Sequence, residues 1–244
     1  MPRDSDTLFD AHVHLQSYPE TLLPAVMVRA REAGVTRFGC CGTNPLDWER
    51  VLAISKNEPG VEASCGLHPW HVGEPGRDDW LGHLETLLSA NPEMGVGEIG
   101  LDNLRPLREA QMKVFSAQLD LALKYNRRVS IHCVKAQSEM AEILRTYSGK
   151  LPQILIHAAS CSPEIWRECE KLGVCITIGP AVLNARATRV RELARTVPEA
   201  RLLFETDAPD MAVNGCAVAE LGGLNSPENL PRIIAEVRRL RTET

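Results

Sequence analysis

The stretch FDAHVHL at residues 9–15 is the first of eight short apolar runs whose repetition along the chain predicts the fold. Apolar and polar residues alternate within it, which is typical of a β-strand, because successive side chains of a strand point to opposite faces. Seven similar runs follow, and each is separated from the next by a longer stretch with helical periodicity. The predicted strands cover residues 8–14, 37–42, 61–67, 95–99, 129–132, 154–157, 174–178 and 202–205.

The stretches between and after these runs predict helices that alternate with the strands. Such alternation indicates parallel strands joined by right-handed crossovers. Eight units within 244 residues favour an α/β fold closed into a (β/α)8 TIM-type barrel rather than an open sheet. No linker or low-complexity tract interrupts the series, so we expect residues 1–244 to form a single domain. The predicted helices cover residues 20–33, 46–56, 79–90, 108–124, 138–147, 163–171, 186–196 and 227–241.

The composition argues against three classes of protein: disordered proteins, basic nucleic-acid binders and membrane proteins. Hydrophobic residues make up 44% of the chain, which is enough for a sizeable core and excludes a disordered protein. A net charge of -5 argues against a binder held to nucleic acid by a basic surface, but not against an enzyme that meets phosphates at a metal site. Residues 1–10 lack the apolar run of a secretory signal, and no stretch is typical of a membrane helix. The eight cysteines form no CxxC pair, so we expect reduced thiols in a cytoplasmic protein without a membrane partner.

Metal-ligand residue types cluster at the ends of the predicted strands. Asp10, His12 and His14 share one face of the first strand, because side chains two apart point the same way. On four further strands a histidine or a carboxylate follows the apolar run, where a polar residue is otherwise unexpected. Barrel enzymes place their active sites at the carboxyl ends of the strands. The predicted metal ligands are His12, His14, Glu98, His132, His157 and Asp207.

Four imidazoles and two carboxylates exceed the needs of one open tetrahedral site and suit two divalent ions, a binuclear metal site. Glu98 is the natural bridge, because a carboxylate can offer one oxygen to each ion. We expect His12 and His14 to hold the more buried ion, and His132 and His157 to hold the second. The alternative is a barrel with satisfied polar groups at its mouth.

Asp207 has a second expected role, as the group that accepts a proton from the water bridging the ions. Asp10 either orients an imidazole or is a buried structural acid. Histidine and carboxylate ligands leave the identity of the two ions open among zinc, manganese, nickel, iron and magnesium.

Six motifs in this order give the chain a resemblance to the TatD family of metal-dependent hydrolases, which are amidohydrolase-like barrels. They are FDAHVHL, CGLHPW, VGEIGLD, IHC, IHAAS and ETDAP, and they span essentially the whole chain. The resemblance implies two metals on the six residues above, and hydrolysis of a phosphodiester, often as a deoxyribonuclease. It also implies that His68 faces the substrate phosphate, which adds His68 to Asp207 and Glu98 as an expected catalytic residue.

The chain departs from the family pattern around the expected phosphate site. Cys133, Val134 and Lys135 follow the strand-5 histidine, where the family usually has a short residue and then arginine. Lys135 and Arg186 are the candidates to replace that arginine, although residues of this kind are more often plain surface charges. The family usually continues into a further C-terminal helix, so a second subunit of a homodimer is one expectation for what covers that surface.

Three functional hypotheses follow. The first is a phosphodiesterase that acts on DNA, another nucleic acid or a nucleotide through a metal-bridging hydroxide. The second keeps the metals but hydrolyses an ester or amide of a small molecule, and the third is a catalytically silent metal-binding protein. Trp70 either stacks on a nucleobase or covers the rim of the core.

Overall fold

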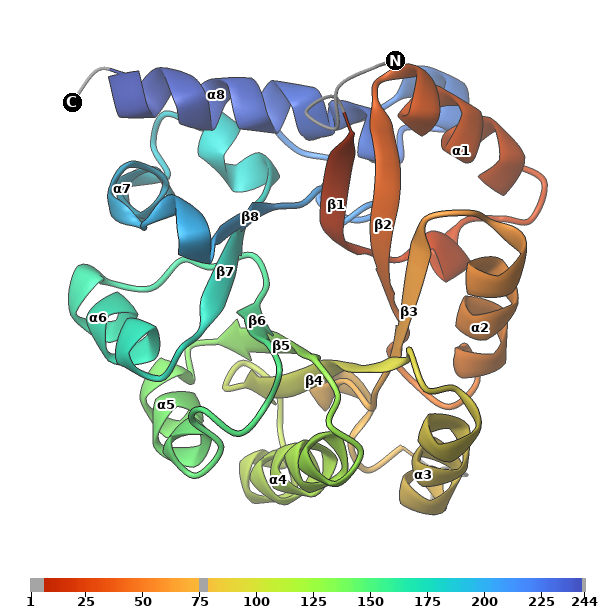
Figure 1. The fold of residues 1–244 in the computed structure, drawn as a ribbon. Helices are drawn as coiled ribbons and strands as arrows, with labels where there is room; N and C mark the ends of the chain where they lie inside the picture. Colours follow the sequence, from red (N-terminus) through yellow and green to blue (C-terminus); the bar gives the residue numbers. More distant parts are fainter. Residues whose placement is uncertain (1–6, 75–78, 243–244) are drawn as a thin grey trace.

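The computed structural model describes residues 7–74 and 79–242, in which eight parallel strands lie side by side in chain order (Figure 1). Each strand pairs in parallel with the next along the chain. Two expectations include residues outside the described ranges: a single domain over residues 1–244, and the lack of a secretory signal in residues 1–10. The strands are β1 (Leu8–Val13), β2 (Val35–Cys41), β3 (Val61–Cys65), β4 (Gly95–Asp102), β5 (Val129–Val134), β6 (Ile154–Ile156), β7 (Cys175–Ile178) and β8 (Leu202–Phe204).

The segment after β8 returns to β1 and brings the two ends of the sheet together. The backbone N–H of Asp207 donates to the carbonyl of His12 at 3.1 Å, and the N–H of His14 donates to the carbonyl of Ala208 at 2.7 Å. The side chain of Asp10 adds to this closure by accepting from the backbone and hydroxyl of Thr206 at 3.0 and 2.5 Å. The predicted (β/α)8 barrel is therefore confirmed.

The helices surround the strands (Figure 1). Two of them, α1 and α8, begin three residues later than predicted, for reasons that lie in the local sequence. Pro24 occupies the first turn of α1, a position where its missing N–H costs no hydrogen bond. Pro227–Asn229 forms a separate 3-10 turn, capped by the Ser226 hydroxyl, before α8 begins. The helices are α1 (Leu23–Glu32), α2 (Trp48–Asn57), α3 (Trp80–Ala90), α4 (Arg108–Lys124), α5 (Gln137–Arg145), α6 (Pro163–Lys171), α7 (Thr188–Thr196) and α8 (Leu230–Thr242).

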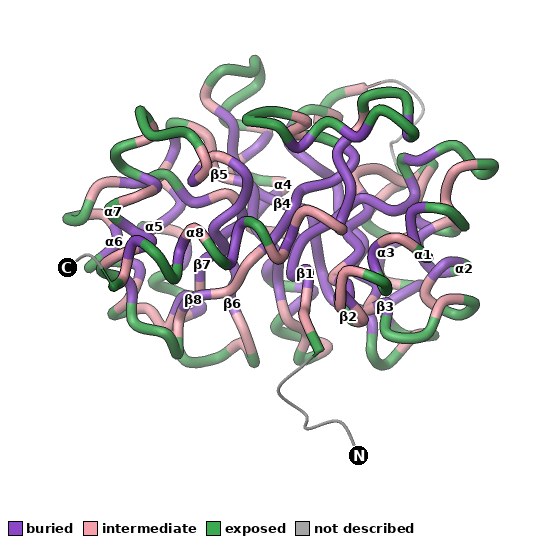
Figure 2. The backbone as a smooth tube through the Cα atoms, turned by 90° about the horizontal axis from the view of Figure 1, so that it is seen from above, coloured by how far each residue is buried: buried purple, intermediate pink, exposed green. Residues whose placement is uncertain are grey.

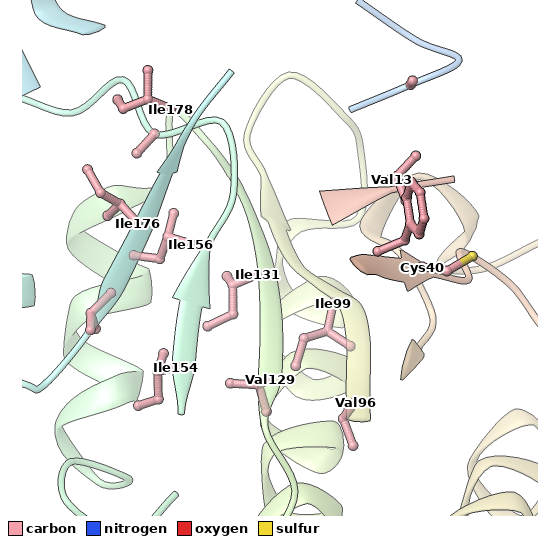
Figure 3. Close-up of a cluster of buried hydrophobic side chains, with 14 of the residues drawn as sticks. Val13, Cys40, Val96, Ile99, Val129, Ile131, Ile154, Ile156, Ile176 and Ile178 are labelled. Atoms are coloured by element: carbon pink, nitrogen blue, oxygen red, sulfur yellow. The ribbon is translucent and has the colours of Figure 1, made fainter. Parts of the chain in front are cut away.

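The main hydrophobic core includes alternate residues of the strands. On β5, Val129 and Ile131 belong to the buried hydrophobic cluster (Figure 3). The cluster also includes side chains of the surrounding helices. Ser130 lies between them, and its hydroxyl meets the imidazole of His12 inside the barrel at 2.9 Å. The same alternation on neighbouring strands turns Ile154, Ile156 and Ile176 into this cluster, so the opposite face is free to carry polar groups.

Burial is greatest in the middle of the molecule and exposure is greatest at its periphery (Figure 2). The site residues lie where the buried strands give way to loops: β6 ends one residue before His157, and β8 ends three residues before Asp207. Within the described part of the chain, no helix has the length and apolar character needed to cross a membrane.

Candidate metal centre

The carboxylate of Glu98 lies at the centre of the predicted site, on β4. Its Oε2 atom is 3.3 Å from Nε2 of His12 and 3.3 Å from Nε2 of His14. These two histidines come from β1 and the residue that follows it, and both are buried. One oxygen of Glu98 therefore faces the histidine pair from the first strand.

The other oxygen of Glu98 faces a second group of imidazoles. Its Oε1 atom is 2.8 Å from Nε2 of His157, 3.0 Å from Nδ1 of His132 and 3.2 Å from Nε2 of His68. His132 lies on β5, His157 directly follows β6, and His68 lies three residues after the end of β3. The two oxygens of a single buried carboxylate are thus divided between two sets of nitrogen donors.

Asp207 completes the side of the site that His12 and His14 form. Its Oδ1 atom is 3.4 Å from Nε2 of His14 and 3.8 Å from Nε2 of His12. The residue has a left-handed backbone with φ of 55°, a conformation that aspartate tolerates better than most residues. The chain therefore turns sharply at Asp207, on the segment that joins the two ends of the sheet.

In His14 and His132, the ring nitrogen that faces away from Glu98 has a hydrogen-bond acceptor beside it. In the neutral ring, the proton therefore lies on that nitrogen, and the nitrogen that faces Glu98 carries a free lone pair. Nδ1 of His14 lies 2.7 Å from the carbonyl of Cys41, which can only accept, so the neutral ring carries its proton there. Nε2 of His132 lies 3.3 Å from Oδ2 of Asp102. A neutral His132 that donates to Asp102 leaves its lone pair on Nδ1, which faces Glu98. In its neutral form, each ring would present the nitrogen that faces Glu98 to a metal.

Two distances between imidazole nitrogens fit a shared ion. Nε2 of His12 and Nε2 of His14 are 3.3 Å apart, and Nδ1 of His132 and Nε2 of His157 are also 3.3 Å apart. Two nitrogens at about 2.0–2.1 Å from one zinc in tetrahedral geometry lie about 3.3 Å from each other. The donor set thus fits one ion at each end of Glu98.

The charges of the site are strongly coupled. Burial raises the pKa of Glu98, but the charges of His157, His68 and His12 outweigh burial and hold the pKa well below its usual range. Burial likewise opposes the charged form of His157, yet Glu98 outweighs it and raises the pKa to about 9. Burial and the charge of His157 lower the pKa of His12 to about 4. The polar cluster is therefore held together by opposite charges when no ion is bound.

His68 lies beside the metal set as a neutral hydrogen-bond donor. Its Nδ1 atom accepts from the backbone N–H of Trp70 at 3.2 Å, so a neutral ring carries its proton on Nε2, toward Glu98. Burial lowers the pKa of His68, which favours this neutral form. The ring is 4% exposed and lines the cavity, which agrees with the expected position at the mouth.

An open cavity of about 430 Å³ leads to these side chains from the carboxyl ends of the strands. It is lined by both carboxylates of the set and by His14, His132 and His157. Neither Lys135 nor Arg186, the expected replacements for the family arginine, is among the described residues that line it, and both are exposed. Trp70 lines the cavity and is 52% exposed.

Asp10 contacts Thr206 rather than an imidazole nitrogen, and burial raises its pKa to about 7. Of the two interpretations of this residue, the structure favours the buried structural acid. Two acids that sequence reasoning did not assign do approach the imidazoles. Asp102 meets His132, and Oε1 of Glu205 lies 3.9 Å from Nδ1 of His157.

Sequence periodicity could have found both acids. Asp102 lies four residues after Glu98 on β4, and Glu205 lies two residues before Asp207, spacings that place side chains on one face of an extended segment. Glu205 is buried, and its carboxylate accepts from the Thr177 hydroxyl at 2.5 Å and from the backbone of Ala158 at 2.7 Å. It thereby positions the turn that follows His157.

Gly100 allows β4 and β5 to approach each other at the site. It has φ of 144°, and a Cβ atom in its place would collide with the carbonyl of His132. Only glycine fits this conformation and this spacing without strain. The glycine between Glu98 and Asp102 therefore lets both acids reach the imidazole of His132.

Comparison with known proteins identifies relatives over nearly the whole chain. The model of the family described as TatD related DNase matches residues 9–244. A 3'-5' ssDNA/RNA exonuclease TatD of Pantoea vagans is 33% identical over 227 residues, which cover 90% of this chain and 85% of that protein. The uncharacterized metal-dependent hydrolase YjjV of Escherichia coli is 33% identical over 240 residues, 96% of this chain and 90% of the relative. The crystal structure of YjjV, a TatD homologue, superposes with a TM-score of 0.89 and covers 97% of this chain and 91% of that chain.

Proposed function

Because this chain belongs to the TatD-related DNase family of hydrolases, we propose that it hydrolyses phosphodiester bonds of DNA or RNA with two divalent ions. The observation that carries the proposal is the division of the Glu98 carboxylate between two sets of imidazoles. A buried carboxylate that offers one oxygen to each set is suited to bridge two ions. The names of the relatives, which include exonucleases that act on single-stranded DNA and RNA, support the substrate class.

The proposed ligands divide into two groups that share Glu98. His12, His14 and Asp207 would hold one ion, and His132 and His157 would hold the other. When bound, the ions would supply an activated water for attack on phosphorus and neutralise charge on the phosphate oxygens. Zinc, manganese, nickel, iron and magnesium all remain candidates, because these ligand types accept each of them to some degree.

Two residues would act on the substrate and the proton rather than as ligands alone. Asp207 lies at the open side of the set, lines the cavity, and would accept the proton of the attacking water. His68 lines the same cavity, and its Nε2–H, which faces Glu98 in this structure, would donate to a phosphate oxygen when Glu98 is engaged by the ions. Since His68 is held neutral by burial, it can donate this hydrogen bond without adding a competing charge.

The test combines elemental analysis of the purified protein with hydrolysis of bis(p-nitrophenyl) phosphate and of single-stranded DNA on the same preparation. We expect two ions per chain, and activity that a chelator removes and added metal restores. Asp207→Asn should abolish turnover, while Asp120→Asn on the outer surface of α4 should leave it unchanged. Two ions without phosphodiesterase activity would direct the search to esters and amides of small molecules. A protein that takes up no metal would refute the proposal.

The proposal also includes a cytoplasmic location and a homodimeric state. All eight cysteines are free thiols, as expected of a cytoplasmic protein. A homodimer stays a prediction from the sequence alone. Light scattering at micromolar concentration would test it, and a strictly monomeric mass would contradict it.

A further inference from the structure

Trp70 is a large apolar side chain that the fold leaves exposed at the mouth of the barrel. It lies in the 3-10 helix Pro69–His71, on the loop that follows β3, and is 52% exposed. Leu104 and Leu107 on the loop after the neighbouring β4 are also exposed, at 64% and 53%. Exposed apolar side chains that gather around a cavity are typical of a ligand-binding surface.

Two contacts fix the position of the Trp70 ring. Its Nε1–H donates to Oδ2 of Asp102 at 2.7 Å, and the guanidinium carbon of Arg105 lies 4.4 Å from the ring centroid. A hydrogen bond at the indole edge together with a cation over the ring gives a defined orientation at a surface site. An exposed ring held in this way loses little conformational entropy when a ligand binds.

The ring is next to the proposed reaction centre. Its centroid lies 5.2 Å from that of His68 and 6.2 Å from that of His132, and both imidazoles contact Oε1 of Glu98. A nucleobase stacked on Trp70 would therefore be separated from a phosphate at the metal centre only by the imidazoles of His68 and His132.

Arg105 is a cation close enough to Trp70 to bind a phosphate of the same ligand. Among the described residues no carboxylate forms an ion pair with Arg105, whereas Arg108 on the same rim is paired with Glu139. A guanidinium that stacks on an aromatic ring keeps its edge N–H groups available for phosphate oxygens. Neither Arg105 nor Lys135 lines the cavity itself, but Arg105 lies against Trp70, which does.

We propose that Trp70 and Arg105 form the subsite for the nucleotide next to the scissile phosphate. The base stacks on the indole, and the guanidinium contacts a backbone phosphate. Aromatic platforms beside cations are a general solution for binding single-stranded nucleic acids, because every base has a stackable face. The inference rests on the proposed function and specifies how this chain, with its altered phosphate site, recognises a nucleic acid.

The test uses metal-loaded protein and a short single-stranded oligonucleotide with phosphorothioate linkages and terminal 2-aminopurine bases. Stacking quenches 2-aminopurine fluorescence, so binding and stacking are read out without turnover. We expect quenching with the parent protein and with Trp70→Phe, which keeps a ring but loses the hydrogen bond to Asp102. Trp70→Ala should abolish the quenching and weaken binding roughly ten- to a hundredfold.

The role of Arg105 is tested by the salt dependence of oligonucleotide binding. Arg105→Ala should reduce the slope of log affinity against log salt by about 0.7, the value for one lost phosphate contact on a single strand. Arg105→Lys should keep the slope, because the charge remains. The matched control is Arg108→Ala, which removes a guanidinium from the same rim. An equal loss of slope in that control would mean general surface attraction and would overturn the contact with Arg105.

The remaining outcomes separate the subsite from the proposed function. Quenching that is unchanged in Trp70→Ala, or lost equally in Trp70→Phe, would overturn the stacking platform even if the parent protein hydrolyses DNA. A parent that hydrolyses no phosphodiester but shows ring-dependent quenching would support the subsite and refute the proposed reaction. A parent that does not bind the oligonucleotide would overturn the subsite.

Discussion

Asp102 connects the rim of the cavity to the metal centre through one carboxylate. Its Oδ2 atom accepts from the indole of Trp70 at 2.7 Å and lies 3.3 Å from Nε2 of His132. Its Oδ1 atom accepts from the backbone N–H of Leu104 at 2.9 Å. Burial raises the pKa of Asp102, but these hydrogen bonds outweigh burial and keep it low, so the group stays ionised and acts only as an acceptor.

The first prediction concerns this carboxylate. Asp102→Asn should lower the affinity for the ion next to His132, or kcat, roughly ten- to a hundredfold, because it removes the acceptor that orients the imidazole. Metal titration and steady-state kinetics on the same preparation would measure both. The matched control is Glu139→Gln, a carboxylate of the same rim that pairs with Arg108. If Asp102→Asn behaves like that control, Asp102 has no positioning role.

The second prediction concerns protons released on metal binding. Without a bound ion, His157 has a pKa of about 9, and the hydrogen bonds of His14 with Asp207 and Glu98 overcome burial and raise its pKa well above the usual value. Both are therefore protonated at neutral pH, and an ion must displace these protons. Metal affinity should rise as the pH is raised from about 6.5 to 9. Calorimetry in two buffers of different ionisation enthalpy would count the protons.

The free energy of unfolding of the metal-free protein should fall as the pH rises, whereas metal affinity increases. A raised pKa in the folded state stabilises the protein fully below the unfolded value of 6.5, and this contribution is lost as the pH rises through about 9. Chemical denaturation of chelated protein at several pH values would show it. A metal-free protein that becomes more stable over this range, with no proton release on binding, would mean that the imidazoles are neutral before the metal arrives.

At the scale of elements, β4 positions the bridging carboxylate, and Gly100 decides how closely it approaches β5. The third prediction is that Gly100→Ala destabilises the protein by about 3 kcal/mol or more, because the added Cβ meets the carbonyl of His132 at an unfavourable φ. It should also lower the metal content, since His132 must move. Urea denaturation and elemental analysis are the measurements.

A variant at a second glycine, Gly149, distinguishes the effect of steric collision from that of backbone strain. Gly149 also has a positive φ, of 69°, but a Cβ there would meet nothing within 4 Å. Gly149→Ala should therefore cost only about 1 kcal/mol and leave the metal content unchanged. Equal losses in the two variants would mean that the close approach of β4 and β5 contributes nothing to the site.

At the scale of the whole molecule, contacts between the first and last strands close the barrel beside the metal ligands. Asp10 and Thr206 join the ends of the sheet, and His12 and Asp207 are linked by their backbones as well as by their proposed ion. Folding of the barrel and assembly of the centre should consequently be coupled. The single domain over residues 1–244 stays a prediction, which thermal unfolding can test.

The fourth prediction is one cooperative thermal transition whose midpoint rises when metal is added. At a free ion concentration of about 100 times Kd, each site that exists only in the folded state adds about 2.7 kcal/mol. For a chain of this length the corresponding increase in Tm is roughly 5–10 °C per site. Differential scanning calorimetry with and without chelator is the measurement. Two separate transitions would contradict a single domain, and an unchanged midpoint would contradict the coupling.

Much of the fold and of the proposed centre could be predicted from local patterns. The alternation of strand and helix periods predicts the barrel, and five of the six predicted ligands line one cavity together with His68. The sixth, His12, is fully buried behind them and contacts Glu98.

The errors in the fold lie at the ends of helices and strands, such as the start of α8 after Pro227–Asn229, where short-range capping decides, and the end of β4, which continues to Asp102. In the site, Asp102 and Glu205 were not assigned. The two interpretations of Trp70, a cover for the rim of the core and a platform for a nucleobase, both stay predictions.

The sequence by itself therefore determined the number and order of the units and the residue types that reach the carboxyl ends of the strands, because side-chain direction within a strand is a local property. The bridging role of Glu98 was expected from the sequence, but only the tertiary structure decided which imidazole nitrogen each of its oxygens faces, and that Asp102 links Trp70 to His132. These arrangements depend on the register of strands distant in sequence and on the orientation of each ring. Neither is encoded in the spacing of residues along the chain.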